Sequence, residues 1–154
     1  MTANKKSRAN KKKPKAASGP LLQAMPHGFL EAARGSEVPA AEAAQVALAV
    51  HEIAQPLIEK APTGREQESA LILATLAWNC CALPEDAQAD YFDSALNEFA
   101  GLFEKSAPEN LTYAMGLLIG RKASLHGSDR RIITEFCFIL QNGRPKIRLA
   151  AVNP

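Results

Sequence analysis

The stretch from Ser69 to Leu83 is apolar on almost every side of a helix, and this feature restricts the fold more than any other. Such a helix cannot lie on a surface, because apolar side chains would face water on at least one side. The stretch is shorter than the roughly 18 apolar residues of a membrane span. It also contains Thr75 and Asn79. We therefore expect a central helix enclosed by other elements, and no membrane span.

A helix over about residues 39–60 should precede the central one. Its apolar side chains recur at helical spacing, namely Val46, Val50, Ile53, Leu57 and Ile58. Pro39 suits its first turn, and Pro56 should kink it, because proline removes a backbone hydrogen bond and clashes with the preceding turn. Thr63 and Glu66 have the spacing of a capping box, which predicts the start of the central helix.

Two helices should follow, over about residues 84–105 and 107–125. The first has an apolar stripe formed by Phe92, Leu96, Phe99 and Phe103, and the second has one formed by Leu111, Met115, Leu118 and Ile119. Gly116 and Gly120 are four residues apart, which permits a close approach of another helix. Gly127 suits the left-handed position that ends a helix.

The last segment has the composition of a β-hairpin. Residues 131–141 are rich in β-branched and aromatic side chains, and Asn142-Gly143 favours a type I′ turn, which needs positive φ at both positions. Pairing Gln141 with Arg144 then sets the register. One face is apolar and pairs Phe138 with Ile147, Phe136 with Leu149, and Thr134 with Ala151. The other face pairs Cys137 with Arg148 and Ile139 with Lys146, and it is basic on one strand.

These elements predict an α+β protein that is mainly α: a bundle of about four helices, a C-terminal two-stranded β-hairpin and a disordered basic N-terminal tail. The length of 154 residues fits one domain. We expect a polybasic tail over residues 1–20, a linker with a short apolar segment over 21–38, and the helical domain with its hairpin over 39–154. Since a lone hairpin is marginally stable and has two free edges, it should lean on the bundle.

The charge is divided unevenly along the chain. Residues 1–15 have a net charge of +7, residues 16–120 of −10, and residues 121–154 of +5. The tail contains seven cations and no acidic residue: Lys5, Lys6, Arg8, Lys11, Lys12, Lys13 and Lys15. Its like charges repel, and it has almost no apolar side chain to bury, so it should not fold alone.

The tail is the first candidate binding site, because seven positive charges attract the phosphates of nucleic acid. The alternative is that the tail only keeps the protein soluble. A second candidate basic patch comprises Arg121, Lys122, Arg130, Arg131, Arg144, Lys146 and Arg148. Its alternative is structural, since cations near a helix C-terminus are stabilised by the helix dipole.

The sequence shows no catalytic or metal-binding motif whose residues have the required spacing. His51-Glu52 begins a zinc-protease pattern, but Gln55 stands where a second histidine is needed. The three cysteines are Cys80, Cys81 and Cys137. They form no disulfide framework, which indicates reduced thiols in a cytoplasmic protein. We expect no catalytic residue, no metal and no cofactor.

The favoured hypothesis is a small non-enzymatic accessory or adaptor protein, with a tail that contacts nucleic acid or a ribonucleoprotein electrostatically and without sequence preference. The alternative is a protein–protein interaction module whose partner, or second copy in a homodimer, meets the acidic helices or the hairpin edge. In that case the tail serves only solubility. An uncharacterised enzyme is the third hypothesis.

Overall fold

The structure, a computed structural model, describes residues 36–99 and 108–154. Within these ranges it contains four helices, α3 (Ala40–Ile58), α4 (Gly64–Ala82), α5 (Glu85–Phe99) and α6 (Pro108–His126), followed by the strands β1 (Ile132–Gln141) and β2 (Arg144–Val152). The strands form a two-stranded antiparallel sheet. The predicted bundle with a C-terminal hairpin is confirmed. The predicted polybasic tail and the apolar segment of the linker lie outside the described residues.

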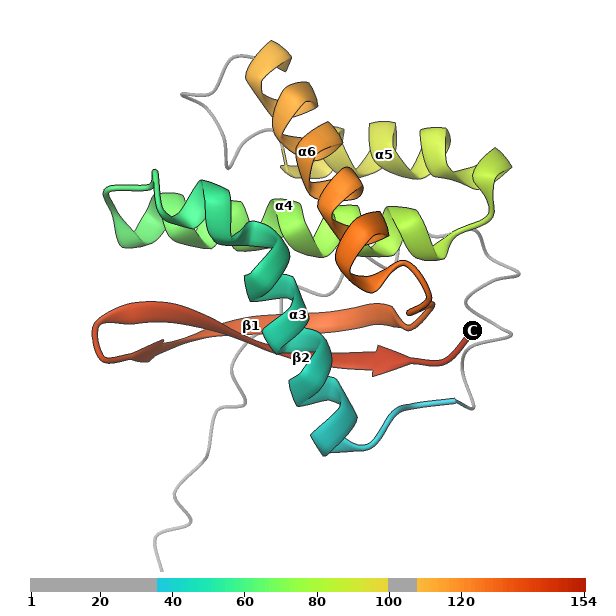
Figure 1. Ribbon diagram of the computed structural model, residues 1–154, viewed down its shortest axis with the longest axis horizontal. Coiled ribbons are helices and arrows are strands. Elements are labelled where there is room, and N and C mark those ends of the chain that lie inside the picture. Colours follow the sequence, from blue (N-terminus) through green and yellow to red (C-terminus); the bar gives the residue numbers. More distant parts are fainter. Residues whose placement is uncertain (1–35, 100–107) are drawn as a thin grey trace, which may run out of the picture.

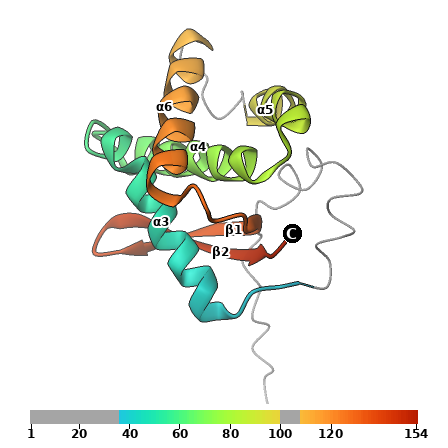
Figure 2. The same ribbon diagram turned by 45° about the vertical axis from the view of Figure 1, so that its right-hand side comes forward.

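Helix α4 lies at the centre of the molecule, as its composition predicts. It lies between α5 and the hairpin, and α3 and α6 cross it (Figures 1 and 2). It contacts all three other described helices and both strands. Every side chain from Ala70 to Cys80 is buried. An apolar surface on all sides of α4 is therefore matched by neighbours on all sides.

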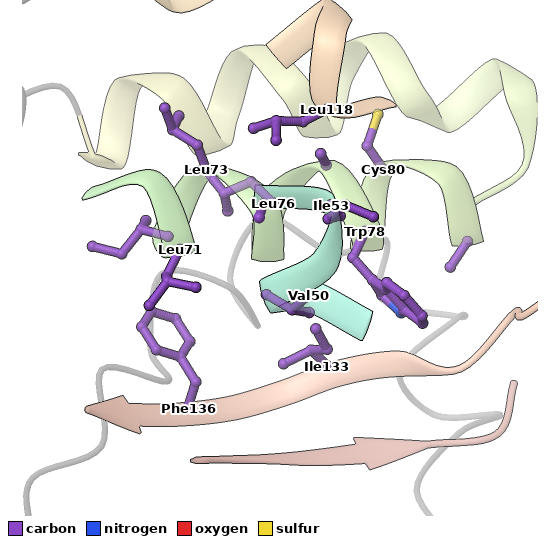
Figure 3. Packing of buried hydrophobic residues seen from close by; sticks show 14 of the residues in the cluster. Val50, Ile53, Leu71, Leu73, Leu76, Trp78, Cys80, Leu118, Ile133 and Phe136 are labelled. Atoms are coloured by element: carbon purple, nitrogen blue, oxygen red, sulfur yellow. The ribbon is translucent and has the colours of Figure 1, made fainter. Parts of the chain in front are cut away.

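The core forms where α3, α6 and β1 meet α4 (Figure 3). Val50 and Ile53 of α3 are fully buried, as is Leu118 of α6, and all belong to one apolar cluster with Trp78. On α5, Phe92 is only partly buried, and the residue beside it, Tyr91, is 1% exposed. The stripe predicted for α5 thus missed Tyr91, a fully buried large side chain. The side chains of Leu96, Phe99 and Phe103 lie outside the described residues.

The predicted capping box at the start of α4 is confirmed. The Glu66 backbone N–H donates to Thr63 Oγ1 at 3.3 Å, and the Thr63 backbone N–H donates to the Glu66 carboxylate at 3.1 Å. Pro39 lies one residue outside α3, and its carbonyl accepts the first backbone hydrogen bonds of that helix. Pro56 lies in the last turn of α3, two residues before the helix ends.

Two predictions about glycines are wrong. No other described helix closely approaches Gly116 or Gly120, because a Cβ at either position would meet no atom within 4 Å. Gly127 does not take the left-handed conformation, since the described residues with positive φ are Asn142 and Gly143. Glycine fits at position 127 for another reason. A Cβ there would lie 2.5 Å from the carbonyl oxygen of Ala123.

The hairpin has the predicted turn and most of the predicted register. Asn142 and Gly143 have φ of 53° and 72°. The predicted pairs from Gln141–Arg144 to Phe136–Leu149 are present on both faces. The prediction that Thr134 opposes Ala151 is wrong. A β-bulge between Ile133 and Glu135 makes Ile133 the partner of Ala151 and leaves Thr134 as the extra residue.

The bulge explains how this end of β1 is buried. It shifts the alternation of side chains by one residue, so that both Ile132 and Ile133 are fully buried. The Thr134 hydroxyl instead donates to the carbonyl of Ala150 at 3.3 Å. The bulge therefore places two isoleucines in the core where simple alternation would have placed one.

The first described residues lie along the outer edge of β2. Glu37 forms an isolated antiparallel bridge with Val152, and the Val38 N–H donates to the Ala151 carbonyl at 2.9 Å. The Asn153 N–H donates to the Ser36 carbonyl at 2.9 Å. The two ends of the described body are thus hydrogen-bonded to each other.

Candidate functional site

Asn79 is the centre of a buried polar cluster inside α4. Its side-chain oxygen accepts the backbone N–H of Ile133 at 2.8 Å, and its Nδ2 donates to the Ile133 carbonyl at 2.9 Å. Nδ2 also lies 3.3 Å from the Tyr91 hydroxyl oxygen. One fully buried amide therefore satisfies both backbone groups of a strand residue and holds α5. These contacts give Asn79 a structural role, because a fully buried amide needs hydrogen-bond partners and these join α4 to β1 and α5.

Lys122 is buried at 1% exposure, which is unusual for a lysine. Its Nζ donates to the carbonyl of His126 at 2.7 Å and to the carbonyl of Asp129, and it lies 4.6 Å from the centroid of the Trp78 ring. Burial lowers the pKa of the ammonium, and the charge of Asp129 opposes that shift. Lys122 thus closes the C-terminal end of α6, and its ammonium is not available to an external anion.

Arg131 forms an ion pair with Asp129 that fixes the start of β1. Its guanidinium donates to both carboxylate oxygens of Asp129 and lies 3.7 Å from the carboxylate of Glu42 on α3. Burial alone would raise the pKa of Asp129, but the hydrogen bonds from Arg131 outweigh it and hold that pKa below its usual value. The Trp78 Nε1–H donates to the Arg131 carbonyl at 2.8 Å.

The two other helix-end cations of the predicted patch bind backbone carbonyls. Arg121 donates to the carbonyls of Ile53 and Glu52 at 3.0 and 2.9 Å, which joins α6 to α3. Arg130 donates to the carbonyl of Cys81 at 3.1 Å. Four of the seven cations in the predicted patch, Arg121, Lys122, Arg130 and Arg131, are therefore engaged inside the protein. That use fits the structural alternative.

The other three cations of the predicted patch lie together on β2. Arg144, Lys146 and Arg148 are exposed and alternate along the strand, so they share one face of the hairpin. They oppose Gln141, Ile139 and Cys137 of β1, none of which is acidic. Within residues 36–99 and 108–154, none of the three forms an ion pair or a side-chain hydrogen bond. We call these three residues the β2 cation row. The seven predicted tail cations lie outside the described residues.

His51 of α3 meets the edge of β2 beside the β2 cation row. The Ile147 N–H donates to His51 Nε2 at 3.4 Å, which requires an unprotonated Nε2. Burial lowers the pKa of His51, and the positive charge of Lys146 lowers it further. In the sequence, His51 stands out only for the failed zinc-protease pattern. Its bond to a strand edge has no signal in the residues around it.

The His51 contact predicts a pH dependence of stability. Since the pKa of His51 is lower in the folded protein, the unfolded chain takes up its proton first as pH falls through about 6.5. The free energy of unfolding should therefore decrease between pH 7.5 and pH 5. The variant His51→Gln keeps an acceptor for the Ile147 N–H but cannot titrate, so urea unfolding across this range should show a smaller decrease. Equal decreases in both proteins would contradict the prediction.

Cys80 and Cys81 do not have the surroundings of a reactive thiol. Cys80, Cys81 and Cys137 are free, and burial raises the pKa of Cys80 to about 11 and raises that of Cys81. A thiol with a raised pKa is a poor nucleophile at neutral pH.

The described residues contain no group of three or more His, Cys, Asp or Glu side chains that could hold a metal ion. None of the four described helices is both long and apolar enough to cross a membrane. Comparisons of the chain with protein-family models, curated proteins and solved structures found no match. The case for a function therefore depends on the chemistry of the exposed surface.

Proposed function

We propose that the protein is a small, non-enzymatic accessory protein of the cytoplasm that contacts nucleic acid, free or within a ribonucleoprotein, electrostatically and without sequence preference. The observation that carries this proposal is the β2 cation row. Arg144, Lys146 and Arg148 lie exposed on one face of a strand, while the buried or half-buried cations Arg121, Lys122 and Arg131 bind groups of the protein itself.

The chemistry of the cation row suits phosphate. Cations at every second strand position project in one direction, and each is free to neutralise a phosphate of an extended backbone. The seven cations in residues 1–15 add a second basic segment to the same chain. The exposed cations carry no base-reading aromatic beside them, since Arg144, Lys146 and Arg148 face Gln141, Ile139 and Cys137. Binding through charge alone would not discriminate sequences.

The test is the salt dependence of binding to a fluorescein-labelled oligouridylate, measured by anisotropy with the full-length chain. Wild-type binding should weaken steeply with salt, because phosphate neutralisation releases counterions. The variant Arg144→Gln/Arg148→Gln should lower the slope of log affinity against log salt by about 1.4, because each neutralised phosphate of a single strand contributes roughly 0.7 to that slope. Replacing all seven tail cations with glutamine should lower it further.

The matched control is Lys60→Gln/Arg65→Gln, which removes two exposed cations from the loop after α3 and the first turn of α4. It has the same change in net charge and should keep the wild-type slope. If this control weakens binding as much as the hairpin variant, net charge explains the binding and the cation row does not. Wild-type protein that binds without salt dependence, or not at all, would overturn the proposed function.

A further inference from the structure

The hairpin turn determines which backbone groups face outward from the sheet. Because a two-residue type I′ turn makes Gln141 and Arg144 a hydrogen-bonded pair, their backbone groups face inward, toward each other. The backbone groups of the neighbouring pair, Leu140 and Pro145, then face outward. The alternation continues along both strands until the bulge. Each outward N–H and carbonyl needs a partner or water.

On β2, the outer edge is blocked at Pro145, Ile147 and Ala151, and within the described residues only Leu149 between them has neither outward backbone group hydrogen-bonded. Pro145 has no N–H to offer, and the outward N–H of Ile147 donates to His51. Farther along, the Ala151 carbonyl accepts the Val38 N–H, and the bridge between Glu37 and Val152 continues the contact. Proline and a covering segment are common means of protecting a sheet edge.

On β1, only the half near the bulge is closed. The Arg131 carbonyl accepts the Trp78 indole N–H, and Asn79 binds both backbone groups of Ile133. Beyond the bulge, the outward groups belong to Phe136, Phe138 and Leu140. None of these has a hydrogen-bond partner within the ranges that the structure describes.

This open segment lacks the usual protection of an edge. From Phe136 to Gln141, β1 contains no charged residue and no proline, and its side chains are mostly aromatic or branched. The Leu140 side chain is 77% exposed. An uncharged edge of this kind is a template for another strand, because its unpaired backbone groups are offered in register.

We propose that this edge pairs with the same edge of a second copy of the chain, so that two β1 strands lie antiparallel across a twofold axis. The preferred register places Phe138 opposite Phe138 of the second copy, and Phe136 opposite Leu140 of that copy. It is the register that pairs all three outward residues of each strand. Shifting the axis by one residue toward either end would place an outward residue opposite the bulge or the Asn142 turn.

The distribution of charge favours a second copy of the chain as the partner that pairs with the open edge of β1. Antiparallel pairing about a twofold axis is self-complementary, so the same segment serves both chains. No like charges meet at the junction, because Phe136 to Gln141 is uncharged. The β2 cation row lies on the outer strand of each copy, which keeps the two rows apart. The product is a four-stranded sheet in the order β2–β1–β1–β2.

Sedimentation velocity of the full-length chain over a wide concentration range tests the association. Wild-type protein should sediment as a dimer, at twice the 16.5 kDa mass of one chain. Leu140→Lys should halve the apparent mass, because it places a charge opposite Phe136 of the second copy, on a side chain that the fold itself leaves exposed. The matched control is Leu48→Lys on α3, where the leucine is 70% exposed, and it should leave the dimer intact.

A cysteine cross-link tests the register. In the preferred register, Cys137 faces residue 139 of the second copy as a non-hydrogen-bonded pair, with Cα atoms about 4.5 Å apart, which a disulfide can span. Ile139→Cys should therefore give a reducible covalent dimer with oxidised glutathione, and Ile139→Cys/Cys137→Ser should not. Wild-type protein that stays monomeric, loss of the dimer in Leu48→Lys as in Leu140→Lys, or a dimer that never cross-links would each overturn the proposal.

Discussion

Replacing Asn79 with leucine is expected to lower the free energy of unfolding by about 4 kcal/mol, the largest effect of any single substitution we propose. Leucine has a similar size, so the change removes hydrogen bonds without creating a large cavity. It leaves the N–H and carbonyl of Ile133 and the Tyr91 hydroxyl without their partner, and each buried unsatisfied group costs about 1–3 kcal/mol. Urea unfolding followed by circular dichroism measures the loss.

Tyr91→Phe is the control for this substitution. It removes only the contact between the hydroxyl and Asn79, and it leaves both bonds to Ile133 in place. The expected loss is about 1 kcal/mol, the usual net value of one hydrogen bond. If Asn79→Leu costs no more than Tyr91→Phe, the bonds to the strand do not hold the hairpin on α4.

Lys122→Met should lower the free energy of unfolding by about 3 kcal/mol. Methionine has a similar length and no charge, so it fills the space but cannot donate to the carbonyls of His126 and Asp129. Hydrogen bonds from a charged donor contribute about 1.5–3 kcal/mol each, and relief of the desolvation of the ammonium offsets part of that loss. The contact with the Trp78 ring is also removed.

Lys60→Met is the matched control, because Lys60 is exposed beyond the end of α3. It makes the same chemical change and should alter stability by less than about 0.5 kcal/mol. Lys122→Met should also change the fluorescence of Trp78 in the folded protein, because it removes the ammonium that lies over the indole ring. Equal stability of Lys122→Met and wild type would show that desolvating the ammonium cancels its hydrogen bonds.

The main outline of the fold could be predicted because its signals are local. An apolar surface on all sides makes α4 central, Thr63 with Glu66 starts it, and Asn142-Gly143 fixes the hairpin register as far as Phe136. Each signal depends on residues within a few positions of one another. The geometry of a turn or a cap is decided at that range.

The bulge and the buried polar contacts could not be predicted in the same way. Asn79 contacts Ile133, and His51 contacts Ile147, so the partners are separated by 54 and 96 residues. A buried polar residue in an apolar stretch indicates that a partner exists, but not which one. No glycine in the sequence marks the bulge at Thr134. The bulge instead accompanies the burial of both Ile132 and Ile133 in the core, which depends on the rest of the fold.

The division of the predicted basic patch into internally bound and exposed cations could not be predicted either, because it also depends on contacts between distant residues. Seven cations near the C-terminus look alike in sequence, but four are held by carbonyls or by Asp129, and the other three have no such bond within the described residues. The only local signal for Arg144, Lys146 and Arg148 was their alternation along β2. In a two-stranded hairpin that packs on a bundle with one face, side chains at alternate positions of a strand point to the solvent. Nothing local distinguishes Lys122 from an exposed lysine. Its burial depends on Trp78, which lies far earlier in the chain.

The bonds from Ser36 and Val38 to Asn153 and Ala151 have a consequence for the order of events during synthesis. Helices α3 to α6 can form as the chain emerges from the ribosome, because their hydrogen bonds join residues four apart. The edge of β2 can be closed only after residue 153 has been made, long after its partner at position 36. Residues 36–38 and the Asn79 side chain of α4 therefore stay without their strand partners until the last part of the chain has been made.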